Sequence, residues 1–447
     1  MNARRVVITG LAPVTPIGIG VRDFWDGLLA GRSGIRRLRS FDPSRFASQI
    51  GGEIDGVNIA DYVPKHYRKA GKIMARDILL AVAAAYHACV DAGLHTRCLV
   101  ERGEAPQRNV DSTRLGVNIG AGLICADLPE LAEALYAGSV DGQFSMARWG
   151  AEGMNNLTPL WLLKFLPNML ACHVTIVHDA QGPSNTITCG EASSHLAIGE
   201  AFRTIARGVA DVCICGGAES KDNPMALIRQ CLGRRLSTRN DAPQGACRPF
   251  GQERDGTVIS EGSGLVILEA LDHALARGAR IYAELVGFGA SNDAFHPAQP
   301  SRPHPEGRGI ALAIGKALRD ARLGPEAIDL VASCACGLSE HDAAEARAVR
   351  AVLGARRAAV PVLNIRGGLG NNGAGSGAID FVAAVLALYH NTIPAGINCA
   401  PVAPECADLK LVTAGPVEAR IDVVLSYAYA LGGGQNACLV VRRYREE

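Results

Sequence analysis

Short apolar runs alternate with amphipathic segments along the whole chain. Runs rich in β-branched residues predict buried strands at residues 5–9, 115–120, 211–217, 330–334 and 422–425. Apolar positions spaced three to four residues apart predict helices at residues 18–31, 74–92, 128–136, 158–172, 308–322, 343–353 and 377–388. This alternation favours an α/β fold in which helices cover both faces of a mixed or parallel sheet.

Two stretches of the sequence resemble each other. DVCICGGAES begins at residue 211, and DVVLSYAYALGGG begins at residue 422. Each consists of a predicted buried strand followed by glycines. The similarity predicts two copies of one α/β unit, which would account for the length of 447 residues.

A sharp turn in the middle of the chain is the first candidate site. Residues 185–188 predict a short strand, and an amphipathic helix follows that ends at Gly208. Between them lies Cys189-Gly190-Glu191. A strand-to-helix turn places a side chain at a helix N-terminus, where free N–H groups and the helix dipole favour a thiolate, an oxyanion or a carboxylate. The chemistry of this turn depends on whether Cys189 or Glu191 occupies that position.

Composition and charge narrow the function classes. The chain is 48% hydrophobic and 20% charged, with a net charge of +1, which is typical of a soluble globular protein without a general attraction to nucleic acid or membranes. The densest basic cluster is Arg32, Arg36, Arg37 and Arg39, which is either a solvated loop or a local anion contact. Apolar runs at residues 78–90 and 381–389 are too short to span a membrane.

The fourteen cysteines predict neither disulfides nor a metal site. Cys213 and Cys215, like Cys334 and Cys336, stand two residues apart on predicted strands, and the sequence contains no C-x-x-C motif. The N-terminal MNARR leads directly into VVITG without a secretory apolar segment. These features predict reduced, mostly buried thiols in a cytoplasmic protein without a bound metal.

Several long motifs in the same order resemble the β-ketoacyl-acyl-carrier-protein synthase II family. They are VVITGLAPVTPIG near the start, GPS before the central turn, DVCICGGAES, RPFGQERDGTVISEGSG followed by RGARIYAELVGFGASND, and GGGQNACLVV near the end. The resemblance covers essentially the whole chain. It implies a thiolase-like αβαβα sandwich with two pseudo-twofold related halves, residues 1–255 and 256–447, and a dimer formed through the middle of the first half.

Active members of that family perform decarboxylative Claisen condensation with a cysteine at the turn and two histidines. In register with the family motifs, Glu191 stands at the cysteine position, Cys334 at the first histidine and Asn371 at the second. The two threonines that contact the pantetheine arm correspond to Cys336 and Leu338. The gatekeeping phenylalanine loop corresponds to residues 430–433.

The individual residues leave alternatives open. Cys189 lies two residues before the turn position, so it is either a displaced nucleophile or a structural thiol. Glu191 is either a base or a carboxylate held by N–H groups at the helix start. The resemblance also implies a structural ion pair between Glu345 and Arg366. His173, His195 and His341 lie near the relevant motifs, but none occupies a family histidine position.

The loss at Glu191, Cys334 and Asn371 within an intact framework implies a non-catalytic chain-length-factor, or ketosynthase β, subunit. Such a subunit pairs with a catalytic ketosynthase and shapes the pocket in which the acyl or polyketide chain grows. We expect no bound cofactor, because the phosphopantetheine arm is presented by an acyl carrier protein. The expected pocket residues are Leu123, Leu128, Leu131 and Leu135. Two alternatives remain: a divergent condensing or decarboxylating enzyme that uses Glu191 or Cys189, and a homodimeric acyl-binding scaffold.

Overall fold

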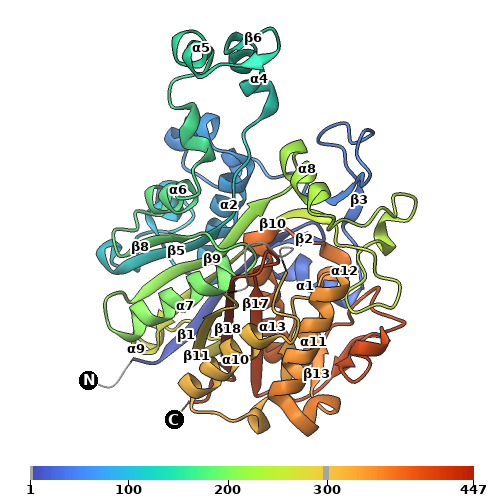
Figure 1. Cartoon of the computed structure of the whole chain (residues 1–447). Coiled ribbons are helices and arrows are strands. Elements are labelled where there is room, and N and C mark those ends of the chain that lie inside the picture. The colour runs from blue at the N-terminus through green and yellow to red at the C-terminus, as the bar shows by residue number, and fades with distance from the viewer. Residues whose placement is uncertain (1–3, 295–301, 447) are drawn as a thin grey trace.

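One large mixed sheet organises the protein (Figure 1). The computed structural model describes residues 4–294 and 302–446. The main strands across the sheet, in order, are β15 (Lys410–Leu411), β13 (Pro361–Leu363), β12 (Leu330–Ala332), β17 (Val423–Tyr429), β18 (Gln435–Arg442), β11 (Ala283–Asn292), β1 (Val6–Thr15), β10 (Ile259–Ala270), β9 (Val212–Ser220), β5 (Leu115–Ala121) and β8 (Ser184–Ile187). The predicted α/β sheet is confirmed.

The strand order contains the predicted repeat. Strands β1, β5, β8, β9 and β10 of the first copy lie in the order β8-β5-β9-β10-β1, and β11, β12, β13, β17 and β18 of the second lie in the corresponding order β13-β12-β17-β18-β11. Parallel and antiparallel pairings also correspond, and β1 pairs with β11 where the copies meet. The two similar sequence stretches form the equivalent strands β9 and β17. Because β10 completes the first copy, the boundary expected between residues 255 and 256 lies one strand too early.

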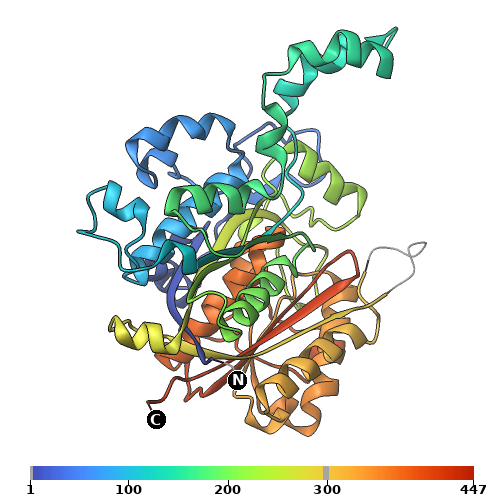
Figure 2. The same cartoon turned by 90° about the vertical axis from the view of Figure 1, so that its left-hand side faces the viewer.

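Helices form three layers around the two copies (Figures 1 and 2). Helices α2 (Arg76–Asp91) and α6 (Met169–His178) cover the first copy, and α10 (Arg308–Ala321) and α11 (Ser339–Leu353) cover the second. Between the copies lie α7 (Ser193–Ala206) and α13 (Ser376–His390), whose apolar side chains join one core. This arrangement is the αβαβα sandwich that the resemblance implies.

The middle layer explains the most apolar segment of the chain. Residues 373–390 are long and apolar enough to cross a membrane by composition, but 89% of that window is buried inside the protein. In α13, every residue from Ser376 to Leu388 is buried. The segment is therefore the core helix of the sandwich, and its apolarity is explained by packing against both copies.

Two smaller predictions need correction. The expected helix at residues 158–172 is divided into the 3-10 turn η5 (Trp161–Phe165) and α6, because Pro167 between them lacks the N–H that a continuous helix needs. The strand expected to break at Gly10 continues to Thr15 past a bulge at Gly10. The remaining helices near the site are α1 (Val21–Leu29), α8 (Pro224–Leu232) and α12 (Arg366–Leu369).

One segment projects away from the sandwich, and we call residues 128–156 the arm. It contains α4 (Leu128–Ala137), the hairpin β6 (Ser139–Val140) and β7 (Gln143–Phe144), α5 (Met146–Ala151) and the turn η4 (Gly153–Asn156). In both views the arm extends beyond the layers that cover the sheet (Figures 1 and 2). The helix predicted at residues 128–136 is thus confirmed, but it lies outside the main core.

We predict that Gly120 is required for the close approach of α7 to β5. A Cβ atom at Gly120 would lie 2.5 Å from the backbone nitrogen of Ser194, so Gly120→Ala should lower the free energy of unfolding by about 3 kcal/mol in urea titrations. Gly150→Ala on the arm is the matched control, because nothing lies within 4 Å of the added atom. Equal stability of the two variants would contradict this packing argument.

Candidate functional site

The predicted turn is present, and hydrogen bonds fix its shape. It joins β8 to α7, and Gly190 has a φ of +57°, which favours glycine. The Ser193 hydroxyl oxygen accepts a hydrogen bond from the Cys189 N–H at 2.8 Å and donates one to the Gly190 carbonyl at 2.6 Å. The turn therefore delivers the side chain of Glu191 into the interior at the start of α7.

The Glu191 carboxylate is buried and held by three donors. Only 7% of the residue is exposed. Its Oε1 lies 3.3 Å from Lys221 Nζ and accepts a hydrogen bond from Asn371 Nδ2 at 3.0 Å. Its Oε2 accepts one from the backbone N–H of Leu431 at 3.0 Å. The carboxylate thus connects the turn to the end of β9, to the loop after α12 and to the loop between β17 and β18.

These donors keep Glu191 ionised. Burial alone would raise the pKa of Glu191, but the ammonium of Lys221, the Leu431 N–H and the Asn371 amide outweigh it and lower the pKa to about 2. Burial would lower the pKa of Lys221, but Glu219 and Glu191 raise it above its usual value. The site therefore contains a buried ion pair at neutral pH, with a carboxylate that is a very weak base.

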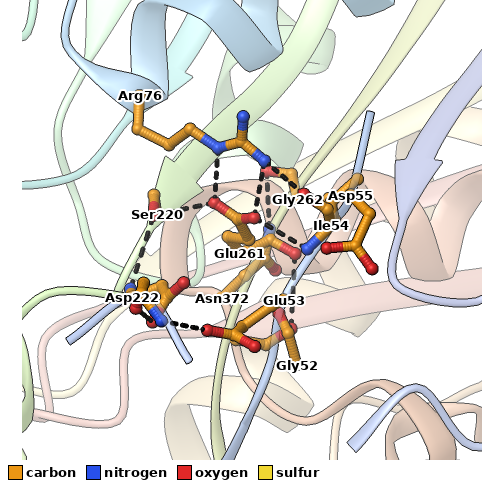
Figure 3. A network of polar contacts seen from close by, with 12 residues as sticks. Gly52, Glu53, Ile54, Asp55, Arg76, Ser220, Asp222, Glu261, Gly262 and Asn372 are labelled. Atoms are coloured by element: carbon orange, nitrogen blue, oxygen red, sulfur yellow. Dashed lines mark hydrogen bonds and ion pairs between the residues drawn. The ribbon is translucent and has the colours of Figure 1, made fainter. Parts of the chain in front are cut away.

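Sequence reasoning missed Lys221, although anchored residues flank it in the sequence. Ser220 donates its backbone N–H to Asp77 at 3.0 Å and its hydroxyl to Glu261 at 3.1 Å, and Glu261 also binds Arg76 (Figure 3). The Lys221 N–H itself donates to the Ser260 carbonyl at 3.1 Å. The backbone that carries Lys221 is therefore fixed. No spacing rule in the sequence connects a lysine after β9 with a turn 30 residues earlier.

Asn371 is oriented by its own environment. Its Oδ1 accepts hydrogen bonds from the Gly373 N–H at 3.0 Å and the Ser376 hydroxyl at 3.1 Å. Since the Gly373 N–H can only donate, the atom facing it must be the amide oxygen, so the NH₂ group faces Glu191. The structure thus brings together Glu191 and Asn371, two of the three positions derived from the family register.

Cys334, the third position, has different partners. Its backbone N–H donates to Glu345 Oε1 at 3.1 Å, and its thiol lies 3.8 Å from Glu345 Oε2. The Tyr427 hydroxyl donates to Glu345 Oε1 at 2.8 Å. Burial raises the pKa of Cys334 well above its usual value. Cys334 is therefore a neutral buried thiol beside Glu345.

The expected ion pair between Glu345 and Arg366 is wrong. Arg366 instead binds Asp380, with Nε 3.0 Å from both carboxylate oxygens. Burial and the nearby charge of Asp342 raise the pKa of Glu345 to about 7. Arg366 starts α12 and Asp380 lies on α13, so the arginine pairs with a carboxylate 14 residues further along the chain.

Cys189 is partly buried, and each of the three histidines contacts another protein group. Burial raises the pKa of Cys189, which disfavours a thiolate. His195 Nε2 lies 2.9 Å from Ser426 Oγ, and His173 Nδ1 lies 2.8 Å from the Tyr67 hydroxyl. His341 Nε2 donates to the Leu431 carbonyl at 2.9 Å. Glu191 and His341 therefore both bind the backbone of Leu431, Glu191 at its N–H and His341 at its carbonyl oxygen.

The predicted pocket leucines and the arginine cluster lie at or near the surface, whereas Cys336 and Leu338 are buried. Leu123, Leu128 and Leu135 are exposed, Leu123 to 61%, and Leu131 is half-buried on α4. Two of the four arginines in the basic cluster are neutralised, because Arg36 pairs with Glu53 at 3.1 Å and Arg39 with Asp55 at 2.7 Å. In residues 4–294 and 302–446, no group of three or more histidine, cysteine or acidic side chains could hold a metal ion.

Comparisons with known proteins show the family of the chain. A family model described as "Beta-ketoacyl synthase, N-terminal domain" matches residues 3–274, and one described as "Beta-ketoacyl synthase, C-terminal domain" matches residues 282–400. A "3-oxoacyl-[acyl-carrier-protein] synthase 2" from Synechocystis sp. is 34% identical over 446 residues, covering 100% of this chain and 99% of the relative.

Two solved structures share the fold and are 28% identical. "The ishigamide ketosynthase/chain length factor" and a type II polyketide synthase acyl-carrier protein "in complex with its ketosynthase bound to the hexaketide" each match with a TM-score of 0.83. Each match covers 99% of this chain and 100% of the compared chain. The chain belongs to the β-ketoacyl synthase family. One of the matched proteins is thus named as a synthase that acts on an acyl carrier protein, and another comes from a type II polyketide synthase.

We predict that Lys221 is required to keep Glu191 buried. Lys221→Met should lower the free energy of unfolding at pH 7 by about 3 kcal/mol, because it leaves a buried carboxylate without its counterion. The double variant Glu191→Gln/Lys221→Met should recover most of that loss. Urea titrations measure both, and a Lys221→Met variant as stable as wild type would contradict the ion pair.

The same variant supplies a readout in pH. Because the pKa of Glu191 falls from 4.5 to about 2 on folding, its stabilisation is complete above pH 4.5 and is lost as the pH falls towards 2. In Lys221→Met this acid-dependent loss should be smaller, since the folded-state pKa then lies closer to 4.5.

Proposed function

We propose that the chain is a non-catalytic chain-length-factor subunit that pairs with a catalytic ketosynthase in type II polyketide or related acyl-chain synthesis. The observation that carries the proposal is the Glu191 carboxylate, which occupies the turn and is bound by Lys221, Asn371 and Leu431. A carboxylate cannot hold an acyl chain as a thioester, and with a pKa of about 2 it is a poor general base.

The surface of the first copy supports a partner subunit. The arm exposes Leu128, Leu135, Tyr136, Val140, Phe144, Met146 and Met154, with Tyr136 82% exposed. Elsewhere on the first copy, β8 is the last strand of the sheet, so one edge of its backbone is available for pairing. A projecting apolar arm and an open sheet edge on the same copy both suit a subunit interface.

The exposure of the four leucines fits the same proposal. Leu123, Leu128, Leu131 and Leu135 do not enclose a pocket within one chain, because α4 projects from the sandwich. Contact with a second subunit would bury these leucines and place them beside the growing acyl or polyketide chain. The ishigamide ketosynthase/chain length factor is a structural neighbour in which these two kinds of subunit are named together.

The decisive experiment is co-expression with a ketosynthase that has an intact cysteine and two histidines and is encoded beside this chain. We expect a stable mixed dimer by size-exclusion chromatography and mass spectrometry. Leu131→Phe should shift the products to chains at least one extender unit shorter, because the larger side chain fills pocket volume. Leu275→Phe, which changes an exposed leucine on α9 (Leu271–Ala276), is the matched control.

The other candidate functions give distinct results in this experiment. Condensation of malonyl and acyl carriers by the purified chain alone, abolished by Glu191→Ala or Cys189→Ala, would show an enzyme. A homodimer that binds acyl chains and ignores the ketosynthase would show a scaffold. Either result would overturn the proposed subunit role.

A second surface favours an acyl carrier protein as a further partner. The 3-10 segment η2 (Lys65–Ile73) exposes Lys65, Arg68, Lys69 and Lys72. Within the part of the chain that the structure describes, no carboxylate forms an ion pair with these four side chains. Acyl carrier proteins in these systems are acidic, so an uncompensated basic cluster is suited to guide one to the complex.

We predict that reversing the charge of η2 weakens carrier binding. Lys65→Glu/Arg68→Glu/Lys69→Glu should raise the Kd for the carrier protein about tenfold at low salt, and the difference should shrink as salt screens the charges. Arg207→Glu/Arg420→Glu/Arg445→Glu changes the net charge equally at exposed side chains elsewhere. If both triple variants weaken binding equally, η2 is not the docking element.

A further inference from the structure

A cleft of about 490 Å³ lies at the C-terminal end of α13. Its walls come from α1, the last turns of α2, the end of α13 and the residues just before β11. The core helix α13 has 15 residues, so its ends are separated by roughly 21 Å along the axis. Asn371 lies just before the other end of this helix, so the cleft is separate from the Glu191 site.

A continuous row of aromatic rings lines the cleft. Trp25 stacks on His390 with ring centres 5.1 Å apart, and His390 meets the neighbouring Tyr389 at 5.2 Å. Tyr389 in turn contacts Tyr282 edge-on at 4.9 Å. These rings come from α1, α13 and the approach to β11, so the tertiary fold brings them together.

Part of this row is open to solvent. Trp25 and Tyr282 are buried, whereas Tyr389 and His390 are exposed at the cleft, together with Val90 on the last turn of α2. Exposed aromatic and aliphatic surface in a concave site is typical of pockets for small molecules. A flat ring system could cover the exposed rings by stacking.

The polar groups of the cleft are also only partly used. Arg280 lies over the Tyr282 ring at 4.4 Å and donates from Nη2 to Asp91 at 2.6 Å. Among the described residues, nothing accepts from its Nε or Nη1. Arg22 and Asp26, which line the same cleft, likewise make no side-chain hydrogen bond or ion pair with any described residue.

The Asp91 carboxylate is already engaged by protein donors and is not available to a ligand. Its Oδ2 accepts hydrogen bonds from the Leu11 N–H at 2.8 Å and the Tyr282 hydroxyl at 3.0 Å, in addition to the Arg280 contact. The polar groups left to a ligand thus include N–H donors on Arg22 and Arg280, an acceptor on Asp26 and the buried Nε2 of His87, which has no hydrogen-bond partner among the described residues. Donors of this kind suit carbonyl oxygens, and the carboxylate suits a hydroxyl group.

We propose that this cleft binds a flat hydroxylated aromatic molecule that carries ring carbonyl groups. Its rings stack on Tyr389 and His390, its carbonyl oxygens accept from Arg280 and Arg22, and a hydroxyl group donates to Asp26. The volume of about 490 Å³ accommodates about three fused rings. The site is complete in one chain and does not depend on the proposed partner subunit.

Tryptophan fluorescence tests the site with the purified full-length chain. The chain has three tryptophans, so Trp149→Phe/Trp161→Phe leaves Trp25 in the cleft as the only reporter. Titration with alizarin, a dihydroxyanthraquinone, should quench Trp25 emission in a saturable manner. Cyclohexanol, which has a hydroxyl group but no aromatic ring, should not compete.

Variants in the same background locate the binding. Tyr389→Ala should raise the Kd for alizarin about tenfold by removing the exposed stacking surface, and Arg280→Gln should also raise it. His390→Ala provides a second stacking variant if Tyr389→Ala fails to fold, as judged by thermal unfolding. Tyr136→Ala on the arm, which removes an exposed aromatic side chain elsewhere, should leave the Kd unchanged. Quenching that does not saturate, or a Kd that neither cleft variant changes, would overturn the proposal.

Discussion

The requirement that a buried carboxylate be neutralised determines the local structure around the central turn. An ionised Glu191 in the interior costs several kcal/mol unless a counterion and hydrogen-bond donors surround it. The structure provides Lys221 after β9, Asn371 before α13 and the Leu431 N–H between β17 and β18. Since Lys221 and Glu191 belong to the first copy and the other two to the second, the carboxylate also joins the two halves of the sandwich.

The same contacts fix the loop between β17 and β18 against the central turn. Glu191 accepts a hydrogen bond from the Leu431 N–H, and His341 donates one to the Leu431 carbonyl, so this loop is held in one position. In an acyl-transfer enzyme, a free thiolate and donors that wait for an oxyanion would be needed here. In this chain the donors are already occupied by the protein's own carboxylate. The family fold is intact, but fold alone does not define function, and these residues favour a partner role.

Much of the fold was predictable because it depends on patterns within single segments. The alternation of strands and helices and the similarity of the stretches at residues 211 and 422 predicted two α/β units, and these stretches form equivalent strands. Predictions failed where a single proline or a long-range strand pairing outweighed a local pattern. Pro167 divided an apolar stretch into two helical pieces, and the repeat boundary moved because β10 pairs with strands of the first copy.

The site, like the fold, was predictable only in part. Register with the family motifs identified Glu191, Asn371 and Cys334, but not which of them touch. Cys334 faces Glu345, and Arg366 pairs with Asp380 in place of Glu345. Lys221 carried no signal, because a lysine after a buried strand is most often a solvated side chain.

By itself, the sequence determined the strand and helix alternation, the repeated unit and the presence of Glu191 at the turn. Only the tertiary structure decided the charge state of Glu191, since its pKa depends on donors from distant segments. The same holds for the exposure of the arm and for the aromatic cleft. Local patterns determine local elements, whereas charge and contact depend on residues that folding alone brings together.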